Sequence, residues 1–236
     1  FLVSQLEGGY KCFRQFVLKQ LQNTVPPLIV LHGKTGVGKT LLLQKLPDYV
    51  DLEGLAQHRS SLFGAIHKSP RTQKDFEALL VQKLKTLPSA LPVFVEGESR
   101  KVVQVFIPAA FAKAMRGGTL VLLKVALETR ISRIVEEYQI CDEQSIQQID
   151  SILLSLRMAL GKLKVEQLRL WLKHGEIENI VHMLLVDYYD PRYLNAMNRY
   201  KFVLELSAED LNQAAAELIG FRNEIVNSYR KQSISK

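Results

Sequence analysis

Short apolar runs alternate along the chain with longer segments in which apolar residues recur every three or four positions. The run at 28–31 contains no polar residue, which is typical of a strand covered on both faces of a parallel sheet. Apolar runs bounded by polar and turn residues predict four further strands, at 49–55, 92–99, 119–127 and 200–207.

Helical spacing fills the segments between these strands. It predicts helices that begin at about Lys39 and that cover 72–87, 108–118, 128–138 and the end of the chain from about 208. From 142 to 187 the pattern is helical throughout, with interruptions near Gly161 and Gly175. Strands that alternate with helices predict an α/β fold with a doubly wound parallel sheet, here with a helical subdomain in the C-terminal half. Ligands of such sheets bind beyond the carboxyl ends of the strands.

The segment after the first strand matches the phosphate-binding pattern G-x-x-x-x-G-K-[ST] at every defined position. It consists of Gly33, Lys34, Thr35, Gly36, Val37, Gly38, Lys39 and Thr40. Glycines let several backbone N–H groups point at one anion, and the following helix adds its positive end. Lys39 would supply a charge to the phosphate oxygens and Thr40 a hydroxyl to Mg²⁺. A chance turn is disfavoured because the complete match lies between a strand and a helix. We therefore predict a P-loop NTPase-like sheet.

Two pairs of acids follow predicted strands. Glu96 and Glu98 end the third strand, where P-loop proteins place the acid that holds Mg²⁺ or its water. Because they lie two positions apart, they share one face of an extended strand. The alternative is a solvated strand cap. Asp51 and Glu53 end the second strand, the side on which phosphotransferases often bind the acceptor, although a solvated turn explains each of them nearly as well.

Several basic side chains have both a functional and an ordinary explanation. Arg59 could clamp a phosphate and His58 could act as an acid or base, but on composition alone a surface contact is the better explanation. Arg130 and Arg133 lie i, i+3 on one helix face after the fourth strand. Small P-loop kinases carry arginines there that close over the transferred phosphoryl group. A solvated helix that pairs with its own glutamates is equally consistent.

The segment 186–197 is dense in aromatic residues. Tyr188, Tyr189 and Tyr193 could stack on bases of a single-stranded nucleic-acid loop. Packing, with the hydroxyl at the surface, is the commoner role of such tyrosines.

Composition narrows the function classes. The 236 residues are 47% hydrophobic, enough for a packed core with an added subdomain, and the net charge of +7 modestly favours a polyanionic partner. The two cysteines, Cys12 and Cys141, lie far apart, which argues against a disulfide scaffold or a zinc site. We find no signal peptide and no apolar run of membrane length, so we expect a cytoplasmic protein.

Four stretches together resemble one family. "GKTGVGKTLLLQKL", "VDLEGLAQHRSSLFG", "PVFVEGESRKV" and "LLVDYYDPRY" resemble the P-loop half of tRNA 2-selenouridine synthase in order and approximate spacing. The second stretch is the most specific, because the Walker loop occurs in many families. The opening "LEGGYKCFRQFVL" is similar to the end of a rhodanese domain. The resemblance implies that residues 1–22 end such a domain and that 23–236 form the P-loop domain, with a mainly helical segment at about 142–190.

The resemblance also implies a reaction. Family members replace the 2-sulfur of 2-thiouridine at the wobble position of tRNA with selenium, with selenophosphate as donor, through an S-geranylated intermediate made from geranyl diphosphate. A rhodanese half with its own catalytic cysteine takes part, and neither cysteine of this chain falls in the corresponding place. The implied partners are the tRNA anticodon loop and a rhodanese domain, with no membrane.

The resemblance implies roles for further residues. It favours catalytic roles for His58, Arg59, Glu96 and Glu98 and phosphate binding by the loop, to which we add Arg130 and Arg133 from their place on the helix. On the tRNA side it favours Ser99, Arg100, Tyr189, Asp190 and Tyr193, to which we add Asp51, Glu53 and Ser60 from their places in the sequence. Thr40 and Glu96 remain the candidates for Mg²⁺. The chain departs from the family pattern at Ser60, Gly97 and Val102-Val103, all on the acceptor side.

Two other functions stay open at this stage. The Walker loop and the two arginines suit an ATP-dependent small-molecule kinase, and ATP or GTP could fill the loop. The domain could also be a non-catalytic module that binds a phosphate ligand or tRNA for a rhodanese partner.

Overall fold

The computed structural model describes residues 6–23, 25–58, 61, 69–97, 101–102, 104–138, 142–197 and 199–234. Its centre is a sheet of five parallel strands in the order β2-β3-β1-β6-β7. The strands are β1 Leu28–His32, β2 Tyr49–Val50, β3 Val93–Glu96, β6 Thr119–Lys124 and β7 Leu204–Ser207. This arrangement confirms the predicted α/β class and the parallel sheet.

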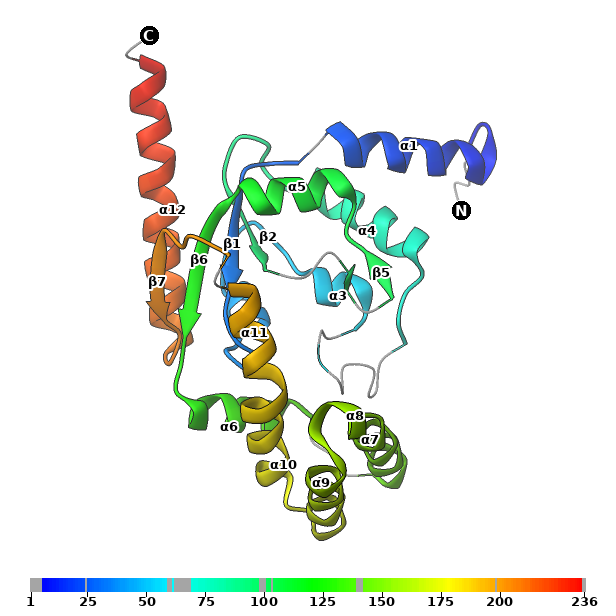
Figure 1. Ribbon diagram of the computed structural model, residues 1–236. Coiled ribbons are helices and arrows are strands. Elements are labelled where there is room, and N and C mark those ends of the chain that lie inside the picture. The colour runs from blue at the N-terminus through cyan, green and yellow to red at the C-terminus, as the bar shows by residue number, and fades with distance from the viewer. Residues whose placement is uncertain are drawn as a thin grey trace.

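Helices cover both faces of the sheet (Figure 1). They are α1 Gly9–Asn23, α3 Leu52–Ala56, α4 Gln73–Lys85 and α5 Ala109–Gly117 on one face, and α2 Lys39–Leu43 and α12 Leu211–Ile234 on the other. Successive residues of β1 point to opposite faces, so Val30 packs in the first core cluster and Leu31 in the second. This double burial explains why the first strand has no polar position.

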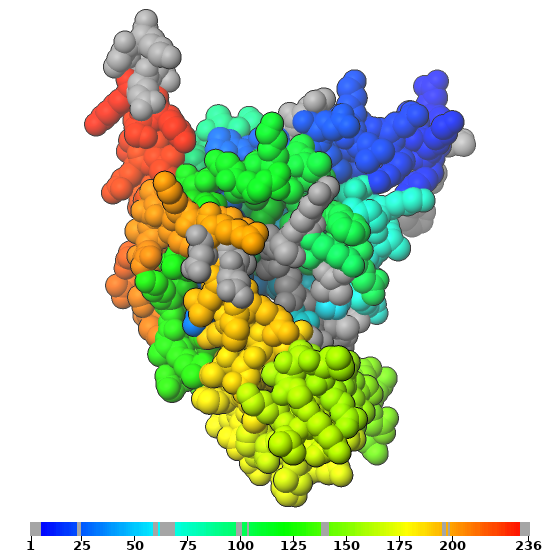
Figure 2. Space-filling view, in the orientation of Figure 1, coloured from blue at the N-terminus to red at the C-terminus, as the bar shows by residue number. Residues whose placement is uncertain are grey.

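A helical lobe extends from the carboxyl end of β6 (Figures 1 and 2). We use this name for residues 127–197. It contains α6 Leu127–Tyr138, α7 Glu143–Ser155, α8 Arg157–Leu160, α9 Lys162–His174, α10 Ile177–Leu184, the π-helix η1 Leu185–Tyr189 and α11 Asp190–Met197. The lobe has a core of its own, with Leu153 and Leu168 fully buried. The predicted interruptions at Gly161 and Gly175 are confirmed, and both glycines have positive φ, 83° and 73°.

The structure corrects several predicted element bounds. The predicted strand at 49–55 is a strand only at Tyr49–Val50, because Asp51 starts helix α3 by accepting a hydrogen bond from the Gly54 N–H at 2.6 Å. The last strand begins at Leu204 rather than at 200, and the final helix begins at Leu211 rather than at 208. The strand predicted at 119–127 ends at Lys124.

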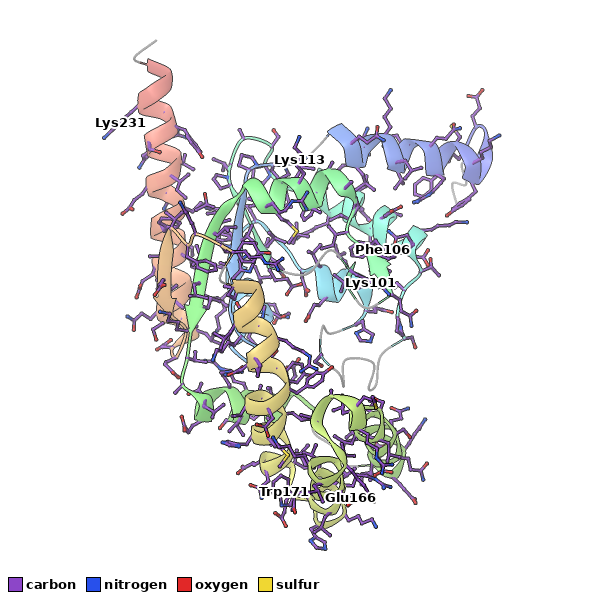
Figure 3. The ribbon with its side chains drawn as sticks, in the orientation of Figure 1. Lys101, Phe106, Lys113, Glu166, Trp171 and Lys231 are labelled. Carbon is purple, nitrogen blue, oxygen red and sulfur yellow. The ribbon has the colours of Figure 1, made fainter. Side chains whose placement is uncertain are left out.

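A small antiparallel hairpin was not predicted. It joins β4 Lys101–Val102 to β5 Val105–Phe106. The Lys101 ammonium lies 5.6 Å from the centre of the Phe106 ring, and both side chains are labelled in Figure 3. Two-residue strands give too little periodicity for a sequence prediction. None of the helices in the described part of the chain is long and apolar enough to cross a membrane.

Candidate functional site

A cavity of about 810 Å³ opens where the glycine-rich loop faces the helical lobe. Loop residues form its floor: Gly33, Thr35, Gly36, Gly38, Lys39 and Thr40. The cavity lies at the carboxyl ends of β1 and β3, where ligands of open parallel sheets bind. Its volume is within the range of about 300–1,000 Å³ that is usual for small-molecule sites.

The loop has a conformation that requires two of its glycines. Gly36 and Gly38 have φ of 81° and 86°. A Cβ atom on Gly36 would come within 2.8 Å of Ile134 Cδ1 and 2.9 Å of the Arg130 carbonyl oxygen. The Lys39 ammonium donates to the Gly33 carbonyl at 3.0 Å and so bridges the two ends of the loop. The motif therefore has the local structure that a P-loop needs.

Two arginines of α6 hold the loop from behind. Arg130 Nε donates to the Thr35 carbonyl at 2.8 Å, and Arg133 Nη1 donates to the Val37 carbonyl at 2.7 Å. The second guanidinium nitrogen of Arg133 reaches the Ala208 carbonyl at 2.7 Å and thus ties the loop to the end of β7. Arg133 also lines the cavity, whereas Arg130 is buried, with 3% of its surface exposed.

Asp190 links the loop to the lobe. Its carboxylate accepts two hydrogen bonds from Arg130, at 2.9 and 2.6 Å, and one from the Lys34 ammonium at 2.8 Å. Burial by itself would raise the pKa of Asp190, but the hydrogen bonds from Arg130 and Lys34 outweigh it and lower the pKa below its usual value. Asp190 begins α11 directly after the π-helix, a rare element that is frequent at functional sites.

One buried acid faces the loop threonine. Glu96, at the end of β3, is fully buried, and its carboxylate accepts from the Thr40 hydroxyl at 3.2 Å and from the Glu53 N–H at 2.8 Å. Within the described residues, no group of three or more His, Cys, Asp or Glu side chains is placed to hold a metal ion. One hydroxyl and one carboxylate nevertheless fit Mg²⁺, which usually binds to one or two protein groups, substrate phosphates and water.

The lobe supplies an apolar wall beside the loop, which we call the aliphatic wall. Five aliphatic side chains line the cavity there: Ile134, Val181, Leu184, Leu185 and Met197. Tyr189, Tyr193 and the exposed Arg192 lie on the same side of the cavity. The Arg192 guanidinium stacks on the Tyr188 ring at 3.7 Å and donates to the Tyr188 carbonyl at 2.6 Å.

A histidine lies at the root of the loop. His32 ends β1 and lines the cavity beside Tyr200, and the two ring centres are 4.8 Å apart. Burial and the positive charge of Lys39 lower the pKa of His32 to about 4, so the ring is uncharged at neutral pH. A Cβ atom on Gly97 would lie 2.5 Å from the imidazole, so only glycine leaves room for this ring.

A comparison with models of protein families shows the family to which the chain belongs. Residues 26–218 match the model described as the tRNA 2-selenouridine synthase AAA domain. The chain belongs to this family. The resemblance to the P-loop half of the synthase is thereby confirmed.

Curated relatives carry the same family name. The tRNA 2-selenouridine synthase of Shewanella piezotolerans is 42% identical over 137 residues, which cover 56% of this chain and 38% of the relative. That of Alcanivorax borkumensis is 31% identical over 221 residues, 81% of this chain and 61% of the relative. That of Hahella chejuensis is 34% identical over 215 residues, which cover 79% of this chain and 57% of the relative. The matches thus span between about two fifths and three fifths of these relatives' lengths. No solved structure matches the chain.

Only some of the predicted site residues of this AAA domain lie at the cavity. The loop, Asp51, Glu53, Arg133, Tyr189 and Tyr193 come together around the cavity, and Glu96 lies beside Thr40. His58 is buried, and its backbone N–H donates to the Glu53 carbonyl at 3.1 Å. Asp190 and Arg130 pair with each other behind the loop. Five predicted residues lie outside the described part of the chain: Arg59, Ser60, Glu98, Ser99 and Arg100.

Sequence reasoning missed His32, Tyr200, Arg192 and the aliphatic wall. The wall residues have the same helical spacing as core residues, so no local signal distinguishes them. His32 had one available signal, its position directly before Gly33. Tyr200 was assigned to a strand that begins four residues later.

Proposed function

We propose that this domain binds geranyl diphosphate and presents it to the 2-sulfur of wobble 2-thiouridine in tRNA. One observation carries the proposal: a single cavity joins a P-loop to an aliphatic wall. The loop suits the diphosphate, and the wall of Ile134, Val181 and Leu184 suits a branched hydrocarbon. Each CH₂ group that is removed from water contributes about 0.8 kcal/mol.

The chemistry would be the displacement of a leaving group. The thiouridine sulfur attacks C1 of the geranyl group, the C1–O bond breaks and diphosphate leaves, while N3 of the base loses its proton. Negative charge develops on the diphosphate oxygens in the transition state. Lys39 and the backbone N–H groups of the loop would stabilise this charge. Thr40 and Glu96 would hold Mg²⁺, which would neutralise further charge on the departing diphosphate.

Water must be kept away from the allyl carbon. The five aliphatic side chains of the lobe would cover the hydrocarbon part of the donor on that side of the cavity. Exclusion of water protects a reactive donor from hydrolysis and strengthens the charge interactions around the diphosphate. The lobe would therefore serve both to bind the tail and to shield the reaction.

The selenium step belongs to a larger protein in this proposal. The chain spans only part of the length of its relatives, and we assign the selenium step to the domain working with a rhodanese half. In that step selenium from selenophosphate would bond to C2 of the base, the C2–S bond would break to release geranylthiol, and water would cleave the Se–P bond to release phosphate. Residues 1–22 would end that preceding domain, since the family match begins at residue 26. Helix α1 packs against the P-loop domain through Val17 and Leu21 and leaves Tyr10, Phe13 and Phe16 partly exposed. A tRNA substrate would place the protein in the cytoplasm.

Calorimetry with geranyl diphosphate and with Mg·ATP tests the proposal. We expect micromolar or tighter binding of geranyl diphosphate, weakened at least about 100-fold by Lys39→Ala, as expected for loss of a charge at a diphosphate. Lys162→Ala is the matched control, because Lys162 lies on the surface of α9. Tight Mg·ATP binding with no response to geranyl diphosphate would refute the proposal and favour a kinase. Tight tRNA binding without turnover by the complete protein would favour a non-catalytic module.

A further inference from the structure

The cavity has a second wall, apart from the loop and the aliphatic side chains of the lobe. We call His32 and Tyr200, with Phe202 behind them, the aromatic wall. The ring centres of His32 and Phe202 are 5.6 Å apart and those of Tyr200 and Phe202 6.2 Å apart, so the three rings form one packed group. His32 and Tyr200 line the cavity, and 39% of the Tyr200 surface is exposed.

The two walls meet the loop at different residues. The aliphatic wall reaches it at Gly36, where an added Cβ would touch Ile134. The aromatic wall reaches it at the other end, because His32 directly precedes Gly33. A diphosphate on the loop would thus have its tail on one side and the aromatic rings on the other. The reacting carbon, at the junction of diphosphate and tail, would be open to an acceptor from the aromatic side.

We infer that the aromatic wall is the stacking site for a single unpaired pyrimidine base, the acceptor of the group that the loop donates, with Tyr200 as the exposed ring and His32 as its buried support. This assignment rests on the proposed function and names the subsite that receives the base. Aromatic rings are the usual platform for splayed-out bases of RNA loops, because every base has a π-face to offer. An aliphatic wall offers no such stacking.

Three features suit the aromatic wall to this role. The His32 ring is buried against Gly97, Tyr200 and Phe202, and its lowered pKa keeps it uncharged beside Lys39. It therefore supports the Tyr200 ring without adding a second positive charge at the loop. Gly97 N–H donates to the Leu31 carbonyl at 2.8 Å, which fixes the glycine against the imidazole. Arg192, exposed at the cavity, offers a cation for the phosphate that flanks the base.

The test measures RNA and donor binding separately on the same variants. The probe is an anticodon stem-loop RNA with 2-thiouridine at the wobble position, followed by fluorescence anisotropy, and the donor is geranyl diphosphate, followed by calorimetry. We expect Tyr200→Leu to weaken RNA binding about 10-fold, as is typical when one base-stacking ring is removed. Tyr200→Phe should retain the affinity. Donor affinity should stay within about 2-fold in both variants, because neither changes the loop.

Controls separate stacking from folding. Tyr10→Leu changes a more exposed tyrosine of α1 outside the cavity and should leave both affinities unchanged. A 5-iodouridine placed at the wobble position should crosslink to the peptide that contains Tyr200. Unchanged RNA affinity in Tyr200→Leu, an equal loss of both ligands, or no RNA binding by the unmodified chain would overturn the inference. If the RNA results hold while geranyl diphosphate fails to bind, the base site stands and the proposed donor falls.

Discussion

The loop side and the lobe side of the cavity are built in opposite ways. The loop side comes from one stretch of eight consecutive residues, six of which line the cavity, and main-chain geometry at Gly36 and Gly38 determines its shape. The lobe side consists of side chains from α6, α10, η1 and α11, which are spread over more than sixty positions of the chain. A short sequence motif can therefore encode a phosphate site, whereas an apolar wall depends on how helices that are distant in the sequence pack together.

The two sides are joined by hydrogen bonds that involve three side chains of the lobe, Arg130, Arg133 and Asp190. Asp190 belongs to the lobe, and its partners Lys34 and Arg130 belong to the loop and to the helix that holds the loop. The lobe therefore influences the shape of the loop through these side chains. The predictions that follow ask how far each side depends on the other.

Removal of the Asp190 charge should have the largest effect on stability. Asp190→Asn leaves the buried Arg130 guanidinium without its counter-charge, and breaking a buried pair in this way costs about 3–5 kcal/mol. We expect the free energy of unfolding in urea to fall by that amount and geranyl diphosphate binding to weaken, because Arg130 also holds Thr35.

A neighbouring aspartate provides the control. Asp187 pairs with Lys164 at 2.9 Å on the exposed face of η1, so Asp187→Asn should cost less than about 1 kcal/mol. Since the pKa of Asp190 is lowered, its stabilisation is present above the unfolded pKa and is lost as the pH falls through the folded one. Equal effects of the two substitutions would contradict a special role for Asp190.

The loop side is also the part of the fold that the sequence predicts best. Continuous apolar runs predicted β1 and the parallel sheet, because double burial removes polar positions from a strand. The same reasoning overextended the strand at 49–55, where Asp51 starts a helix. The apolar residues after it pack as a helix face, and a run this short does not distinguish the two periods.

For the site, the sequence located residues that lie together where the chemistry is local, and their roles stay predictions. The loop residues and the Thr40–Glu96 pair come together as expected from a complete motif and an acid at a strand end. Arg130 is a different case. Its position on a helix face predicts a side chain that either binds phosphate or is solvated, whereas the structure pairs it with Asp190, sixty residues away. Partners at such separations follow from tertiary packing, which no sequence period encodes.

The second prediction concerns acid sensitivity on the loop side. The folded pKa of His32 is about 4 and the unfolded value about 6.5, so the unfolded chain binds the proton first as the pH falls. The neutral ring therefore makes its full contribution to the free energy of unfolding above pH 6.5. This contribution is lost as the pH falls from 6.5 to 4, and the total loss is about 3 kcal/mol.

His32→Phe should remove this part of the pH dependence of the unfolding free energy. His174→Phe changes an exposed histidine of α9 and should leave the profile as it is. The measurement is urea unfolding at several pH values between 7 and 4. A profile of His32→Phe parallel to that of the unmodified chain would show that His32 is not the group responsible.

The third prediction tests the lobe side alone. Val181 is buried and lines the cavity, so Val181→Phe should fill the space that we assign to the distal part of the geranyl tail. We expect the preference for geranyl over dimethylallyl diphosphate to fall about 10-fold, since one or two carbons in an apolar pocket contribute about 1–3 kcal/mol. Val186→Phe, at an exposed position of η1, is the control. If affinity for both donors drops equally, the wall does not select chain length.

The smallest effect is expected on the outer face of the lobe. Lys162 lies 3.7 Å from Glu166 on α9, and both side chains are more than half exposed, while Arg169 pairs with Asp150 close by. Exposed i, i+4 pairs contribute about 0.3–0.5 kcal/mol, and charges already paired with acids attract a polyanion weakly. Lys162→Ala should therefore change the unfolding free energy by less than about 0.5 kcal/mol.

Lys162→Ala should also leave the affinity for the anticodon stem-loop within about 2-fold and its salt dependence unchanged. Loss of a lysine that contacts phosphate would instead lower the slope of log affinity against log salt concentration by about one unit. A lower slope would mean that tRNA crosses the outer face of the lobe, and that the lobe contributes to RNA binding beyond the wall it gives the cavity.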